Sequence, residues 1–191
     1  MKYLLTLSAL LMVTFSAHAD WELNNEKTSV NFISIKKSTA GEIHKFNMLS
    51  GSINENKVRV SIDLSSVETN IPIRNDRMKS MLFEVVNFSS ADITTTIDKN
   101  KLDNLKTGES YQKEMKLQLS LHGKNKDISS LVQVTKQSDN SVLVYSIHPV
   151  IINAADYNLS NGIEELRKVA KLPSISAAVP VTFNLVFNKK A

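Results

Sequence analysis

Three segments of the chain alternate between apolar and polar residues, and this pattern constrains the fold more than any other feature. They cover residues 57–64, 111–121 and 179–187. A period of two is that of a β-strand with one buried face. The apolar side of the second segment consists of Met115, Leu117, Leu119 and Leu121. Because such strands must bury their apolar faces together, the chain is predicted to be all-β.

Turn-forming residues separate these segments, and further strand-like segments, at hairpin spacing. Turns are predicted at 54–56, 122–125 and 138–140, where Asn, Asp, Ser and Gly gather. The further strands are predicted at 29–36, 42–53, 93–97, 127–136 and 141–148, with Gly51 marking a bulge or turn. About eight strands at this spacing favour a closed antiparallel eight-stranded β-barrel over a parallel α/β sheet.

Residues 71–88 leave the strand pattern for a helical one. Apolar residues recur there at i, i+3, i+4 and i+7, which is one face of a short helix. They are Met78, Met81, Leu82 and Val85. Asn75 suits the N-cap and Asp76 the first turn, so the helix is predicted to begin at Asp76. This segment is expected to form an apolar, Met-bearing lid over one end of the barrel, with ordinary core packing as the alternative.

A second short helix is predicted over residues 162–172. Asn161 provides its cap, Glu164 completes a capping box, and Pro173 follows its end. The polar segment 99–110 contains turn residues and is predicted to be a surface connection. The expected architecture is therefore a barrel with two short helices.

The first 19 residues have the three parts of a secretory signal peptide. Lys2 precedes an apolar run, and Ala17-His18-Ala19 forms a small-x-small cleavage site. Cleavage is predicted after Ala19, which leaves residues 20–191 as one exported domain. The chain has no cysteine, so a lipoprotein anchor is not expected. The predicted localisation is the periplasm.

Composition narrows the range of functions. Without cysteine, thiol redox chemistry and thiolate metal sites are excluded. After loss of Lys2 the charge is +3, from 22 Lys and Arg against 19 Asp and Glu, and these residues are scattered. No nucleic-acid partner is therefore predicted. His44, His122 and His148 lack ligand spacing, and no nucleophile elbow or phosphate loop is present, so neither a metal site nor an enzyme is predicted.

Short motifs follow one another in a fixed order along residues 20–191. They are Trp21-x-Leu23-Asn24, Ser29-Val30-x-Phe32, His44-x-Phe46, Leu49-x-Gly51-x-Ile53, Arg74-Asn75, Leu119-x-Leu121-His122-Gly123 and Asp156-Tyr157. In this order and spacing they resemble the YceI-like family, exported bacterial lipocalin-like barrels that bind polyisoprenoid lipids. The resemblance implies a lipocalin-like barrel that holds an isoprenoid lipid. The lipid is expected to be a ubiquinone-like isoprenoid quinone or a related prenyl chain.

The residues expected to contact this ligand lie on the predicted inner face and in the predicted lid. They are Phe32, Phe46, Ile73, Met78, Met81, Leu82, Phe83, Leu117, Leu119, Val144, Tyr157 and Phe183. Arg74 and Asn75 are candidates for contact with a polar head group, and Arg74 has bracing of Asp76 or of a loop carbonyl as its alternative role. His44 is expected in a loop rather than against the ligand.

Such a barrel is compatible with three functions. The leading one is a carrier that sequesters a polyisoprenoid lipid without covalent chemistry and needs no cofactor. Its expected partners are the lipid and, transiently, a membrane or a lipid-donor protein, and a homodimer is left open. The second is a solid-barrel, stress-related module that binds another protein. The third is an enzyme acting on an isoprenoid, which requires Arg74, Asp76, His44 or Asp156 to converge in the cavity.

Overall fold

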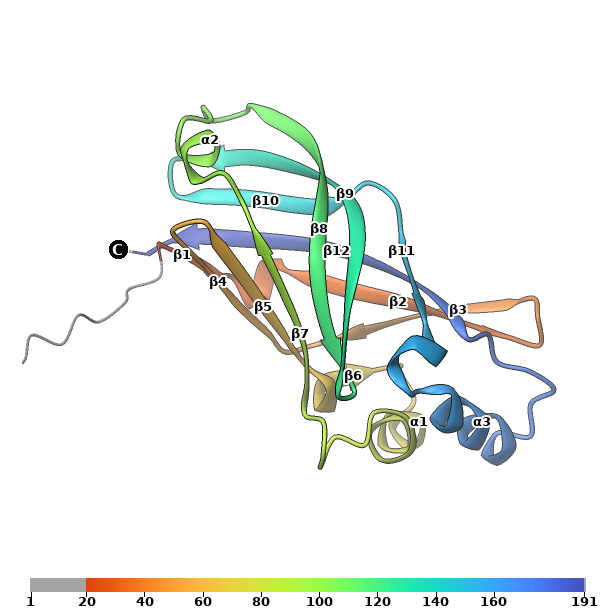
Figure 1. Ribbon diagram of the computed structural model, residues 1–191. Helices are drawn as coiled ribbons and strands as arrows, with labels where there is room; N and C mark the ends of the chain where they lie inside the picture. Colours follow the sequence, from red (N-terminus) through yellow and green to blue (C-terminus); the bar gives the residue numbers. More distant parts are fainter. Residues whose placement is uncertain (1–19, 191) are drawn as a thin grey trace, which may run out of the picture.

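Eight antiparallel strands close into a ring in the computed structural model, which describes residues 20–190 (Figure 1). In ring order they are β1 (Trp21–Leu23), β4 (Leu49–Asn54), β5 (Lys57–Asp63), β7 (Ser90–Thr96), β8 (Ser110–Leu121), β9 (Lys124–Ser138), β10 (Ser141–Ser146) and β12 (Ala178–Lys189). The ring closes because β1 pairs with both β4 and β12. The predicted eight-stranded antiparallel barrel is confirmed.

Four further strands extend the wall beyond the ring. They are β2 (Ser29–Lys36), β3 (Ala40–Phe46), β6 (Val67–Glu68) and β11 (Val150–Asn153). Strand β12 makes this extension possible because it is long enough to pair with different strands along its length. One edge meets β1 and then β2, and the other meets β10 and then β11. The sequence predicted 42–53 as one strand, but the chain breaks at Asn47 and Met48 to pass from β3 to β4.

The hairpin turns agree with the sequence, whereas Gly51 has a different role. His122 and Gly123 connect β8 to β9 with φ of 48° and 73°, as a two-residue type I′ hairpin requires. Gly51 lies inside β4, and a Cβ there would stand 2.7 Å from the carbonyl oxygen of Arg59 on β5. This glycine therefore allows a close approach between two strands and marks neither a bulge nor a turn.

The helices differ from the prediction in their limits. Helix α1 (Pro72–Arg77) begins at Pro72, whose missing amide donor suits the first turn, and not at Asp76. Asn75 does not cap it but lies inside it. Helix α1 continues directly into a π-helical turn, η3 (Met78–Leu82). Near the C-terminus, α3 (Ser160–Val169) begins two residues before the predicted start, and Asn161 lies inside it and is not its cap.

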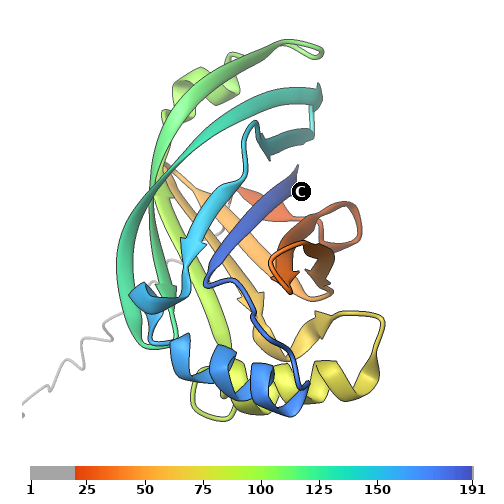
Figure 2. The ribbon, with the colours of Figure 1, turned by 90° about the vertical axis from the view of Figure 1, so that its right-hand side faces the viewer.

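The remaining helical segments are short. Residues predicted as a surface connection contain α2 (Lys99–Asp103), which Asp98 caps and from which Leu102 is buried. Three 3-10 turns complete the chain: η1 (Asn25–Lys27), η2 (Leu64–Ser66) and η4 (Ala154–Tyr157). Helices α1 and α3 lie side by side across one end of the barrel, and α2 lies at the other end (Figures 1 and 2). No helix within residues 20–190 is long and apolar enough to cross a membrane.

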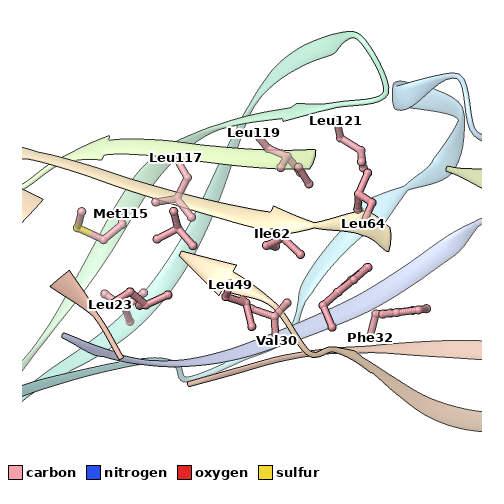
Figure 3. Packing of buried hydrophobic residues seen from close by; sticks show 14 of the residues in the cluster. Leu23, Val30, Phe32, Leu49, Ile62, Leu64, Met115, Leu117, Leu119 and Leu121 are labelled. Carbon is pink, nitrogen blue, oxygen red and sulfur yellow. The ribbon is translucent and has the colours of Figure 1, made fainter. Parts of the chain in front are cut away.

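The apolar faces of the strands point into the barrel. Met115, Leu117, Leu119 and Leu121 follow one another along β8, on the opposite side of the interior from Val30 and Phe32 of β2 (Figure 3). The most completely buried large side chains are Trp21, Leu64, Val142, Tyr157 and Phe187. The alternation seen in the sequence is therefore the alternation between the inside and the outside of one barrel.

Candidate functional site

The barrel encloses an apolar cavity of about 460 Å³. Its lining reaches from Leu102 and Tyr111 beside α2 to Leu64 and Leu121 at the end that α1 and α3 cover. This volume lies within the range of about 300–1,000 Å³ that is usual for small-molecule sites. The interior is therefore hollow along the barrel axis.

Most of the predicted contact residues line this cavity. They are Phe32, Phe46, Leu82, Phe83, Leu117, Leu119, Val144 and Phe183. The strand members lie on the inner face because their positions in the two-residue period match those of the buried core. Leu82 and Phe83 come from the segment that covers the barrel end. The structure thus brings residues from β2, β3, β8, β10, β12 and the lid segment to one surface.

Four other predicted positions lie outside the lining. Ile73 is 58% exposed on α1, Met78 and Tyr157 are buried behind the lining, and Met81 is half-buried. The π-helical turn explains the misplacement of the methionines. The amide of Phe83 donates to the carbonyl oxygen of Met78 at 2.9 Å, five residues back. This turn is wider than an α-helical one, so of the predicted face Met78, Met81, Leu82 and Val85 only Leu82 lines the cavity, together with its neighbour Phe83.

The lid end closes through a tight contact between α3 and the π-helical turn. A Cβ at Gly162 of α3 would stand 2.6 Å from the carbonyl oxygen of Met81 and 2.7 Å from the Cα of Leu82. Only glycine leaves room for two backbones at that distance. Leu159, just before α3, lines the cavity beside Leu82 and Phe83. The glycine contact therefore determines how closely the two segments cover the cavity.

Aromatic rings gather at this covered end. Phe32 and Phe46 have ring centroids 5.3 Å apart, and Phe46 and Phe83 are 5.8 Å apart. His44 is edge-on to Phe32 at 5.3 Å and only 3% exposed within β3, so the prediction of a loop residue is wrong. Burial, followed by the charge of Arg74, lowers the pKa of His44 to about 4. The ring is therefore neutral near pH 7.

Arg74 and Asn75 brace the start of the lid segment and do not line the cavity. Arg74 pairs with the Glu42 carboxylate and donates to the Thr69 carbonyl oxygen at 2.6 Å, so it braces a loop carbonyl as the alternative proposed, but not Asp76. The Asn75 side-chain oxygen accepts from the amide and the hydroxyl of Thr69 at 2.9 and 2.6 Å. Neither of these two candidates for contact with a head group belongs to the cavity lining.

Glu42 connects this brace to the barrel wall. Lys36 donates to the same carboxylate at 2.7 Å. The hydrogen bond from Lys36, then that from Arg74, holds the pKa of Glu42 below its usual value. Lys36 and Arg74 are thus engaged with one carboxylate outside the cavity.

Among residues 20–190, the polar residues that line the cavity lie near α2. They are Thr95, Asp98, Lys101, Tyr111 and Lys113. None of the five was predicted to contact a ligand, and Lys101 lies in the segment 99–110 that was predicted to be a surface connection. One signal was available: residue 113 occupies an inner position of the β8 alternation, two residues before Met115, yet it is a lysine. A charged residue on the apolar side of a strand indicates a position near an opening.

The residues named for an enzymatic function do not converge. None of Arg74, Asp76, His44 and Asp156 belongs to the cavity lining. Within residues 20–190, no group of three or more His, Asp or Glu side chains is placed to hold a metal ion.

Comparison with known proteins places the chain among proteins of the same fold. The YceI-like domain family matches residues 21–187. A solved polyisoprenoid-binding domain from Saccharophagus degradans, implicated in plant cell wall breakdown, is 36% identical with a TM-score of 0.89. That similarity covers 91% of this chain and 100% of the other. No curated protein matches the chain.

Two more distant structures share the fold alone. Burkholderia cenocepacia BcnA is 16% identical with a TM-score of 0.63, covering 86% of this chain and 98% of its own. The Campylobacter jejuni YCEI protein is 16% identical with a TM-score of 0.55, covering 78% of this chain and 85% of its own. The same barrel fold is therefore found in proteins that share only 16% sequence identity with this chain.

Proposed function

This chain belongs to the YceI-like family, and from that premise we propose that it binds a polyisoprenoid lipid inside its barrel and carries it without covalent chemistry. The observation that carries the proposal is the apolar cavity of about 460 Å³. The relative that is 36% identical is described as a polyisoprenoid-binding domain, which supports the same ligand class here. An isoprenoid quinone or another prenyl chain is the proposed occupant.

The physical basis of binding is burial of the chain against the inner faces of the strands. Transfer of each CH₂ group out of water contributes about 0.8 kcal/mol, so a dozen groups contribute on the order of 10 kcal/mol before the costs of association. Lining residues such as Val60, Leu117 and Val181 offer no directional polar groups. The cavity would therefore recognise a hydrocarbon chain by its shape and by the burial of its apolar surface.

The proposed place of action is the periplasm. The support is the signal-like sequence of residues 1–19, which lie outside the residues that the structure describes. An exported carrier would collect its lipid from a membrane or a donor protein. Its mature chain would begin at Asp20.

The cavity counts against the alternative of a solid barrel that only binds other proteins. The enzymatic alternative required four residues to converge in the cavity, and none of them lines it: Arg74, Asp76, His44 and Asp156. A carrier needs no such convergence.

The test is recovery of the lipid from protein purified from its own host. Native mass spectrometry and organic extraction are expected to show one lipid of isoprenoid mass per chain. Leu117→Trp places an indole ring in the cavity and is expected to lower the amount of co-purified lipid, whereas Gln118→Trp, on the exposed side of the same strand, is expected to retain it. Equal lipid content in the two variants, or a wild-type protein that cannot be loaded with any prenyl lipid, contradicts the proposal.

A further inference from the structure

The barrel wall has a stretch that backbone hydrogen bonds do not close. Strand β9 pairs with β10 only from Val132 onward, and the last contact on that edge is the amide of Ile147, which donates to the carbonyl oxygen of Leu131 at 2.9 Å. Strand β11 then follows β10 along β12 and pairs with β12 alone (Figure 1). Within residues 20–190, no backbone hydrogen bond therefore joins β11 to residues 124–130 of β9. We call this unpaired stretch the seam.

The cavity lies directly behind the seam. Its lining includes Ile128 of β9, together with Val150 and Ile152 of β11. Ile151, between the two lining residues of β11, is 58% exposed. Strand β11 is therefore a single layer between the cavity and the solvent, and apolar side chains line both sides of the seam.

The seam is closed by side-chain packing. The 3-10 turn η4, which follows β11, packs against β9, and Tyr157 at the end of this turn is 2% exposed. The hydroxyls of Tyr157 and of Ser130, a buried residue of β9, have no hydrogen-bond partner among residues 20–190. A buried hydroxyl without a partner is unfavourable, whereas exposure to water satisfies it. No polar contact of these two residues therefore opposes opening of the seam.

Residues 150–157, which we call the flap, are attached along one edge only. The flap pairs with β12, and the amide of Ala154 donates to the carbonyl oxygen of Ala177 at 2.9 Å. The exposed residues His148 and Pro149 precede it, and Asn158 follows it with a left-handed φ of 57°. Since no strand pairing exists on its β9 side, the flap can move away from β9 without breaking the barrel ladder.

The cavity lining near α2 offers a less suitable passage for a hydrocarbon chain. Charged residues line the cavity there, among them Asp98, Lys101 and Lys113. An apolar chain that passes them displaces water from charged groups and gives no hydrogen bond in return. At the seam the same chain meets only the aliphatic side chains of isoleucine and valine. The seam is therefore the passage whose chemistry matches the tail.

We propose that the flap is a side gate, which opens away from β9 so that the apolar chain of the ligand enters and leaves the cavity through the seam. This inference rests on the proposed function and adds the route of exchange. A gate changes the barrier to binding and leaves the bound state as it was. Locking it shut is therefore expected to slow uptake and release by the same factor, with no change in Kd.

The experiment tethers the flap to β9. Because the chain has no cysteine, Ser129→Cys/Ile151→Cys provides its only two thiols, at exposed positions of β9 and β11. A bis-maleimide with a reducible disulfide spacer joins them. The probe is an anthraniloyl ester of geranylgeraniol, whose exchange with phosphatidylcholine vesicles is followed by stopped-flow fluorescence. The tether is expected to slow uptake and release at least about tenfold, and reduction of the spacer is expected to restore both rates.

Two other tethers are the controls. Gln118→Cys/Asp127→Cys joins exposed residues that face each other in the hydrogen-bonded β8–β9 hairpin. Thr96→Cys/Lys116→Cys joins exposed residues of β7 and β8 beyond the last pair of those two strands, toward α2. Both cross-linked proteins are expected to exchange the probe at the wild-type rate.

The outcomes separate the two proposals. If the wild-type protein does not bind the probe, the proposed function fails, and the gate fails with it. If the probe binds but the seam tether leaves its exchange rates unchanged, the gate is overturned while the carrier function stands. Slowing of the same size by either control tether would also overturn the gate, since the effect would then not be specific to the seam.

Discussion

Gly162 provides the sharpest test of how the lid end is built. The substitution Gly162→Ala adds a Cβ that would stand 2.6 Å from the Met81 carbonyl oxygen and 2.7 Å from the Leu82 Cα. Both atoms belong to the backbone of the π-helical turn, so no side-chain rotation relieves the overlap. The two segments must separate by a few tenths of an ångström or more.

Two opposing effects decide the sign of the stability change. Replacing glycine by alanine inside a helix stabilises it by about 0.5–1 kcal/mol. Overpacking a close contact typically costs about 1–3 kcal/mol, and a backbone contact lies in the upper part of that range. The expected net result is a loss of about 1–2 kcal/mol. For a domain of this size that corresponds to a decrease in Tm of roughly 2–8 °C.

Thermal unfolding followed by circular dichroism measures this change. Asn161→Ala is the matched control because Asn161 is the exposed neighbour in the same helix, and it is expected to leave Tm unchanged or raise it slightly. Gly162→Ala should also speed release of a bound apolar ligand, since the lid no longer closes fully. A Tm at or above wild type for Gly162→Ala would refute the tight contact between α3 and the π-helical turn.

Three other perturbations probe the core and the lid brace. Phe187→Ala removes a side chain that is 1% exposed and is expected to lower the free energy of unfolding by about 3–5 kcal/mol in urea titration. Asn75→Ala leaves the buried amide of Thr69 without its acceptor and its hydroxyl with only the Ile71 carbonyl oxygen at 3.4 Å, and is expected to cost about 1–3 kcal/mol, measured in the same way. Stability should fall as the pH decreases from 6.5 to about 4, because the unfolded chain protonates His44 over this window while the folded chain does not. At about 1.4 kcal/mol per pH unit the loss is about 3 kcal/mol, and His44→Phe should largely remove it, leaving the smaller acid dependence of Glu42 at lower pH.

The strand pattern was predictable because it depends on local alternation. Residues 111–121 show it most clearly, and the β8–β9 hairpin follows from the turn residues His122 and Gly123. A period of two fixes which side chains share a face, so the six strand residues among the cavity residues named in advance could be identified in this way. The period does not fix the distance between opposite walls of the barrel. The presence of a cavity could therefore be established only from the structure.

The lid could not be predicted in detail because α- and π-helical turns use the same kinds of residue. The spacing of Met78, Met81 and Leu82 fits an α-helix equally well. The wider turn packs closely against α3 at Gly162, a residue distant in sequence. A contact between residues so distant in sequence leaves no pattern in the local sequence that could predict it.

The partners of Arg74 could not be predicted from the sequence for the same reason. Its acceptors are Glu42, on the distant strand β3, and the Thr69 carbonyl oxygen. A lone arginine in the sequence is compatible with a head group or with such a brace. Only the arrangement of β3 against the lid segment distinguishes the two.

The cavity itself links stability to occupancy. At about 24 cal/mol per Å³, the rate found for cavities left in packed cores, an empty volume of about 460 Å³ corresponds to roughly 11 kcal/mol of missing packing. That is comparable with the order of 10 kcal/mol that a dozen CH₂ groups gain on burial. An empty barrel must therefore be held by its wall, through the hydrogen-bonded closure of β1 against β4 and β12. An apolar chain that fills the hollow restores the contacts that the inner side chains do not make with one another, which is why a tail, and not the head group, should contribute most of the affinity.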